Sequence, residues 1–172
     1  MWLVFTNCCE AVILGFYEPR NLGEVAVVVN TATPNSIEFT LPSELAAQQV
    51  VHERIVTQIR NAGSTSRDEF CIRLALEEAL TNAIRHGNKL SPDKKVFVKS
   101  TVDGGAVTIE IADEGDGFVQ VDVPDPTADE NLGRPTGRGV LLIQSFMDDV
   151  RYNEQGNEVT MVKVLGSLTE TQ

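Results

Sequence analysis

The sequence has little cysteine and little histidine. Its 172 residues include three cysteines and two histidines, and the cysteines lack metal-ligand spacing, because Cys8 and Cys9 are adjacent and Cys71 stands alone. A cysteine in a helical pattern, such as Cys71, usually packs as a small hydrophobic residue. We therefore expect no cysteine-based metal site, and we expect reduced thiols in a cytoplasmic protein.

Basic residues are also scarce. Lysine and arginine number 14 against 25 aspartates and glutamates, which gives a formal net charge of −11 and a pI of about 4.6. Such a chain is repelled by the phosphates of nucleic acids and by anionic lipid, so we expect neither nucleic acid nor a membrane as a partner. The charge suits a protein partner with a basic surface.

No hydrophobic run is long enough to span a membrane comfortably. Residues 1–17 are apolar, but they lack the basic start of a signal peptide, include Glu10 and are short for a bilayer. We therefore expect a cytoplasmic protein. We interpret residues 1–34 as an N-terminal appendage or the product of a start placed too early, residues 35–166 as one domain, and residues 167–172 as a tail.

The domain begins with a predicted strand and two predicted helices. Residues 36–41 alternate apolar and polar side chains, which is the period of a half-buried strand. The first helix follows, with Ser43 as its expected N-cap. The second is expected to begin at Ser66, whose hydroxyl would form a capping box with Glu69, and to end near Gly87.

The second half of the domain is predicted to be mostly strand. Residues 96–102 and 106–111 form a hairpin, because Asp-Gly-Gly at 103–105 is a strong turn signal. A helix over about 137–147 and a closing hairpin over 150–165 complete the order. This order predicts an α/β protein, a two-layer α/β sandwich whose mixed, mostly antiparallel sheet carries helices on one face.

Residues 118–136 form a long polar segment between these elements. The segment contains three prolines and four acidic residues, and it shows no apolar periodicity. A stretch of this length in a compact domain is usually a functional lid or a disordered insert. We expect a lid here.

Glu78 and Asn82 are four residues apart on the second predicted helix, so they share one face. An asparagine amide oxygen suits a Mg²⁺ ion already held by phosphates. A carboxylate one turn away can accept a proton from a hydroxyl nucleophile. Taken alone, the pair is better explained as two solvated side chains of a surface helix.

Two segments place glycines at alternate positions. Asp113-x-Gly115-x-Gly117 follows a predicted buried strand, where a carboxylate can accept a hydrogen bond from an amino group such as adenine N6 and glycines admit a close ligand. Gly137-x-Gly139 begins a helix, whose unpaired N–H groups favour phosphate. Neither segment is a P-loop or a dinucleotide-binding fingerprint, and each alone is weak evidence.

The combination resembles the GHKL superfamily of ATPases, which includes gyrase, chaperone, histidine kinase and mismatch-repair proteins, and most closely the bacterial anti-sigma-factor serine/threonine kinases. Residues 77–87 (EEALTNAIRHG) resemble the N box, residues 113–118 (DEGDGF) the G1 box and residues 136–140 (TGRGV) the G2 box. Residues 146–150 continue the match. The resemblance covers about residues 36–165 and implies the Bergerat fold.

The resemblance implies a role for each matching residue. Glu78 would be the general base, Asn82 the protein's Mg²⁺ ligand and Asp113 the reader of adenine. His86 would either lie near the phosphates or simply cap its helix. The other nucleotide-binding positions implied are Gly115, Gly117, Gly137, Arg138, Gly139 and Val140.

Two positions leave alternatives open. Arg138 or Arg134 would face the phosphates. The family often has glycine-threonine at the last hairpin, with the threonine near adenine, whereas here Gly156 is followed by Asn157. The asparagine either substitutes as a hydrogen-bonding group or loses that contact.

The resemblance implies an ATP- and Mg²⁺-dependent serine kinase that phosphorylates a STAS-domain anti-anti-sigma partner and also sequesters a sigma factor; it allows a homodimer. One alternative is a nucleotide-ordered sequestration module without kinase activity. Another is the ATP-binding half of a split histidine kinase, suggested by His52-Glu53-Arg54. That segment lacks the proline of a phosphoacceptor box and a separate dimerisation hairpin, so we interpret His52 as a packing or surface residue.

Overall fold

The computed structural model describes residues 3–7, 10–14, 27–33, 35–117 and 138–166. The expected lid, residues 118–136, lies outside these ranges, as do Gly137 and the tail at 167–172.

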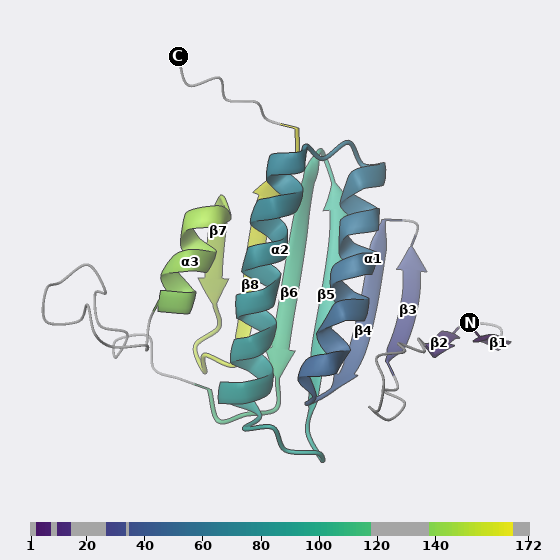
Figure 1. The fold of residues 1–172 in the computed structure, drawn as a ribbon, viewed down its shortest axis with the longest axis vertical. Coiled ribbons are helices and arrows are strands. Elements are labelled where there is room, and N and C mark those ends of the chain that lie inside the picture. The colour runs from purple at the N-terminus through teal and green to yellow at the C-terminus, as the bar shows by residue number, and fades with distance from the viewer. Residues whose placement is uncertain (1–2, 8–9, 15–26, 34, 118–137, 167–172) are drawn as a thin grey trace, which may run out of the picture.

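Three helices lie on one face of a six-stranded sheet (Figure 1). The spatial strand order is β3-β4-β5-β6-β8-β7, and every pair in this sheet is antiparallel. The strands of the sheet are β3 Val28–Thr33, β4 Ser36–Pro42, β5 Lys95–Asp103, β6 Ala106–Asp113, β7 Asp149–Tyr152 and β8 Glu158–Val164. The helices are α1 Gln48–Asn61, α2 Ser66–Thr81 and α3 Arg138–Phe146, with short turns η1 Leu45–Ala47 and η2 Asn82–Gly87. The predicted two-layer α/β sandwich is therefore confirmed, although its sheet was expected to be mixed and its strand pairs are all antiparallel.

The core lies between the sheet and the helices. Alternate residues of neighbouring strands point into it, as the row Phe39, Val98, Ile111 and Val159 illustrates, and all four are buried. The apolar stripes of α1 and α2 belong to the same core, because their buried residues, such as Ile55 and Leu76, join this row in one cluster. The residues on the outer sides of α1 and α2 are consequently not needed for this core.

Three strands were not predicted from sequence, and one of them, β3, belongs to the main sheet. β3 pairs with β4, and the buried Val29 of β3 and Val27 just before it belong to the core. The sequence reads Val25-Ala26-Val27-Val28-Val29, an apolar run without alternation, so the period-two signal is missing. The short strands β1 Leu3–Asn7 and β2 Glu10–Leu14 form a separate two-stranded sheet.

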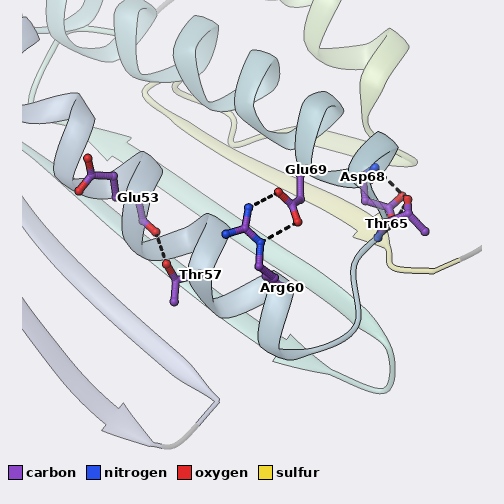
Figure 2. Close-up of polar contacts among 6 residues, drawn as sticks. All are labelled: Glu53, Thr57, Arg60, Thr65, Asp68 and Glu69. Carbon is purple, nitrogen blue, oxygen red and sulfur yellow. Dashed lines mark hydrogen bonds and ion pairs between the residues drawn. The ribbon is translucent and has the colours of Figure 1, made fainter.

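The start of α2 differs from the prediction by one residue. Thr65, not Ser66, is the N-cap: its backbone is extended, and its hydroxyl accepts from the Asp68 N–H at 3.2 Å. The Asp68 carboxylate accepts from the Thr65 N–H at 2.8 Å, which completes the capping box (Figure 2). The predicted Ser66–Glu69 box is wrong because Glu69 instead forms a two-pronged ion pair with Arg60 of α1.

Ser43 is also not an N-cap. The chain enters α1 through the turn η1, and no side chain caps either element. The buried Ser43 hydroxyl donates to the Lys94 carbonyl at 2.8 Å and accepts from Asn88 at 2.8 Å.

Within the described residues, no helix is long and apolar enough to cross a membrane.

Candidate functional site

Glu78 lies near the carboxyl-terminal end of α2, and Asn82 directly follows that helix. Glu78 lies on α2 and is half-buried, whereas the neighbouring Glu77 is exposed. Asn82 begins η2, a π-helical turn in which the Asn88 N–H donates to the Ala83 carbonyl at 2.8 Å. Such turns are rare and often occur at functional sites. The helix therefore ends near Gly87, as predicted, but through a widened turn.

Glu78 and Asn82 both face the start of α3. A Cβ atom built on Gly139 would lie 2.7 Å from Glu78 Oε2, which is too close for a real contact, and 3.5 Å from Asn82 Nδ2. Only a glycine thus lets α3 begin this close to the two side chains without displacing them. The first turn of a helix also has N–H groups without intrahelical partners and a positive dipole end. The fold therefore brings a carboxylate, an amide and an anion-attracting helix end together.

Asp113 ends β6 in a pocket formed by glycines. A Cβ atom on Gly87 would overlap the Asp113 carboxyl group, and one on Gly115 would overlap the Gly87 carbonyl. The Gly115 N–H donates to Asp113 Oδ1 at 2.8 Å. Burial raises the pKa of Asp113, while this hydrogen bond and the charge of Lys94 partly oppose the shift. The result is a half-buried carboxylate surrounded by backbone.

Asn88 supports this pocket, although no sequence motif indicated it. It is buried, and its amide group donates to the Ser43 hydroxyl and to the Lys95 carbonyl, both at 2.8 Å. Its Oδ1 accepts from the Glu114 N–H at 2.9 Å, directly beside Asp113. Asn88 thereby joins the ends of β4, η2 and β6 to the start of β5. The only local signal is an asparagine after the helix-ending Gly87, which does not reveal partners 7 to 45 residues away.

Gly117 lies against the turn between β7 and β8. Its φ is +75°, and a Cβ atom there would overlap the Gln155 carbonyl. Asn157 of the same turn donates from Nδ2 to the Asp113 carbonyl at 2.9 Å. The amide of Asn157 therefore makes a hydrogen bond at this position, although its partner is the chain itself.

The remaining predicted positions differ in exposure. His86 and its neighbour Arg85 are exposed on η2, and Val140 is half-buried on α3. Gly137 and Arg134 lie outside the described residues, and so does the side chain of Arg138. His52 is half-buried on α1, and burial lowers its pKa, with nearby Glu77 opposing and Arg73 adding to that shift.

Metal binding by a protein cage alone has no support in the described part of the chain. There, no three residues among the histidines, cysteines, aspartates and glutamates gather in a group that could hold an ion. Asn82 could contribute one amide oxygen, the kind of ligand that accompanies phosphate oxygens around Mg²⁺. A divalent ion at this site would depend mainly on a bound phosphate compound.

Comparison with known proteins adds independent findings. The profile of the histidine kinase-like ATPase domain matches residues 41–163. An anti-sigma F factor of Oceanobacillus iheyensis is 35% identical over 138 residues, which covers 76% of this chain and 91% of that protein. An anti-sigma F factor of Heyndrickxia coagulans is 36% identical over 93 residues, 52% of this chain and 63% of its own length. The serine-protein kinase RsbW of Staphylococcus aureus is 28% identical over 137 residues, 75% of this chain and 86% of that protein.

Proposed function

The chain belongs to the histidine kinase-like ATPase domain family, and we propose that it is an anti-sigma-type serine protein kinase that uses ATP and Mg²⁺. The single observation that carries the proposal is the convergence of Glu78, Asn82 and Gly139 at the start of α3. In the proposed pathway the phosphate acceptor is a serine of a STAS-domain anti-anti-sigma protein, and a sigma factor is the second partner. The names anti-sigma F factor and serine-protein kinase RsbW, which the relatives carry, support this pairing of roles.

The residues present suit an adenine nucleotide. The Asp113 carboxylate accepts hydrogen bonds only, so it complements an amino group and not a carbonyl. Gly87 and Gly115 leave no room for side chains around it, so the carboxylate lies in a cradle of backbone that a flat ring could approach. At the other end, the start of α3 offers backbone N–H groups to phosphate. In this proposal one nucleotide binds with its base at Asp113 and its phosphates at the start of α3.

Three side chains have distinct roles in the proposed reaction. Bound ATP with Mg²⁺ supplies the phosphoryl group and neutralises the charge that develops during its transfer. Asn82 would hold the ion with its amide oxygen. Glu78 would orient the attacking serine hydroxyl and accept its proton. Asp113 would fix the base, so that both ends of the nucleotide are held.

The exposed Glu77 provides a matched control for Glu78. A general base acts in the transition state, so Glu78→Gln should leave ATP affinity near normal and lower phosphate transfer about a hundred- to ten-thousand-fold. Glu77→Gln lies about 100° around the helix and should keep most activity. Transfer of radioactive γ-phosphate to a STAS-domain protein measures activity, and calorimetry measures ATP affinity. Full activity of Glu78→Gln would remove Glu78 from the reaction.

A sequestration module is the second candidate, because most of the relatives considered above are named anti-sigma factors. In that case ATP would order the protein for binding a sigma factor without phosphate transfer. The wild-type protein decides between the two: no transfer to any STAS-domain partner, together with nucleotide-dependent capture of a sigma factor, would replace the kinase by the module. For either function we propose a cytoplasmic location.

A further inference from the structure

The turn that joins β7 to β8 is attached to the end of β6. The Asp113 N–H donates to the Asn157 carbonyl at 2.9 Å, and Asn157 Nδ2 donates back to the Asp113 carbonyl at 2.9 Å. One asparagine therefore holds both backbone groups of the residue whose carboxylate lies in the glycine pocket. The main-chain bond would form with almost any residue at 157, whereas the side-chain bond requires a donor.

Asn157 is itself held in one orientation. Its Oδ1 accepts from Asn153 Nδ2 at 2.8 Å, which fixes which end of the amide points toward Asp113. Asn153 Oδ1 in turn accepts from the N–H groups of Gly156 and Asn157, at 2.7 and 3.1 Å. The amide group of Asn157 is thus bonded on both sides, with its oxygen toward Asn153 and its N–H donor toward Asp113.

Gly117 provides an independent contact between the same two segments. It sits against the Gln155 carbonyl so closely that a Cβ atom would overlap it. Both ends of the Asp113–Gly117 loop therefore touch the β7–β8 turn, one through Asn157 and the other through Gln155. A shift of this turn would move the loop that carries the Asp113 carboxylate.

We propose that Asn157 is a positioning residue that holds the Asp113 carboxylate in place and thereby sets the preference for adenine over guanine nucleotides. This inference rests on the proposed function. Adenine presents an amino group at the position where guanine presents a carbonyl oxygen, and an ionised carboxylate can accept from the first but repels the second. The preference depends on how firmly the carboxylate is held, because a mobile carboxylate can turn away from guanine.

The ratio of ATP affinity to GTP affinity tests this role. Asn157→Ala removes the donor to the Asp113 carbonyl, and Asn157→Asp keeps the size and shape of the side chain but cannot donate. We expect the ratio to fall about five- to tenfold in both variants, the loss of one hydrogen bond that serves only the preferred base. Glu154→Ala, in the same turn and exposed, is the matched control and should keep the wild-type ratio. Competition against a fluorescent nucleotide, with the melting temperature measured in parallel, supplies both quantities.

The ratio of ATP affinity to GTP affinity distinguishes a positioning role of Asn157 from a purely structural one. A loss of folded protein, or the added charge of Asn157→Asp, weakens ATP and GTP alike and leaves their ratio unchanged. A wild-type ratio in folded Asn157→Ala and Asn157→Asp would overturn the inference while ATP binding stands. Equal affinity of the wild type for ATP and GTP would also overturn it. A wild type that binds neither nucleotide would instead overturn the proposed function, and the inference with it.

Discussion

At the scale of single residues, Gly139 matters because its missing side chain leaves room for two side chains of the candidate site. Its Cα faces the carboxylate of Glu78 and the amide of Asn82, two side chains that come from a different helix. The neighbours that a Cβ would meet are ends of flexible side chains, so an alanine would displace them without breaking the fold. A substitution at Gly139 should therefore change the arrangement of the candidate site without changing the stability of the fold.

Gly139→Ala should therefore lower phosphate transfer with little change in melting temperature. The new Cβ would lie 2.7 Å from Glu78 Oε2, so the carboxylate must move, and a displacement on the order of 1 Å can cost up to about a hundredfold in rate. We expect a roughly ten- to hundredfold loss. Gln144→Ala, exposed on the same helix, should keep full activity. Unchanged transfer by Gly139→Ala would show that Glu78 can move without consequence.

Asp113 predicts a pH dependence of nucleotide binding. Burial raises its pKa, so the carboxylate is ionised, and able to act purely as an acceptor, only above a value higher than the ordinary value of about 3.9. ATP affinity should be highest above that raised pKa and should fall as the pH drops through it. Asp113→Asn should bind ATP more weakly near neutral pH and lose this part of the pH dependence. Calorimetry of both proteins over the same pH range cancels the titration of ATP itself, and identical pH profiles would contradict the role of Asp113.

At the scale of elements, the ends of α2 are specialised in different ways. The start is closed by a capping box, and the end is widened into the π-helical turn η2, which is stabilised by the Asn88 N–H and by Asn88's contacts with three other segments. Because its start is capped and the turn at its end is bonded to other segments, α2 holds Glu78 and the following Asn82 in fixed positions. The geometry of the candidate site thus depends on both ends of one element.

Two neighbouring substitutions test the start of α2. Thr65→Ala removes the hydroxyl that accepts from the Asp68 N–H and should lower the free energy of unfolding by about 1 kcal/mol, within a range of roughly 0.5–2. Ser66→Ala should change it little, because Ser66 is exposed in the first turn and alanine is a strong helix former. Urea denaturation monitored by circular dichroism measures both. A larger loss in Ser66→Ala than in Thr65→Ala would restore Ser66 as the cap.

At the scale of the whole molecule, a few long-range bonds join the helical layer to the sheet. The carboxylate of Asp68, at the start of α2, accepts from the Gly166 N–H just beyond β8 at 2.9 Å, across 98 residues of sequence. Within the helical layer, the Arg60–Glu69 ion pair joins α1 to α2 at 2.6 Å, but Arg60 is largely exposed and such a pair contributes little. The buried Asp68 is therefore the more important of these connections.

Asp68 predicts how stability changes with acid. Burial by itself would raise its pKa, but hydrogen bonds from Gly166 and Thr65 and the charge of Lys163 lower the pKa overall. A lowered pKa in the folded state means that the stabilisation is fully present above the unfolded value, about 3.9, and is lost as the pH falls through the folded value. Asp68→Asn should cost about 1–3 kcal/mol near neutral pH, and less at acid pH.

The melting temperature as a function of pH measures this difference, and Asp93→Asn, in an exposed turn, is the control. The wild type and Asp68→Asn should differ most near neutral pH and converge in acid, whereas Asp93→Asn should follow the wild type throughout. A constant gap between wild type and Asp68→Asn across the pH range would mean that the ionised form of Asp68 contributes nothing to stability.

The sequence by itself determined the elements whose signal is local. The alternation in residues 36–41, the turn at 103–105 and the helical stripe around Glu78 each need only a few neighbouring residues, because periodicity decides which face is buried. The spacing of the motifs also identified Glu78, Asn82, Asp113 and Gly139 as candidate residues, whose roles stay predictions.

The tertiary structure alone decided the contacts between segments far apart in the chain. Whether Thr65 or Ser66 caps α2 depends on which residue is extended, and both are equally suitable by composition. The partners of Asn88 and the bond from Asn157 to Asp113 join positions up to 45 residues apart. Sequence order carries no record of such pairs, because a hydrogen bond between distant residues forms only after the sheet has brought their strands together.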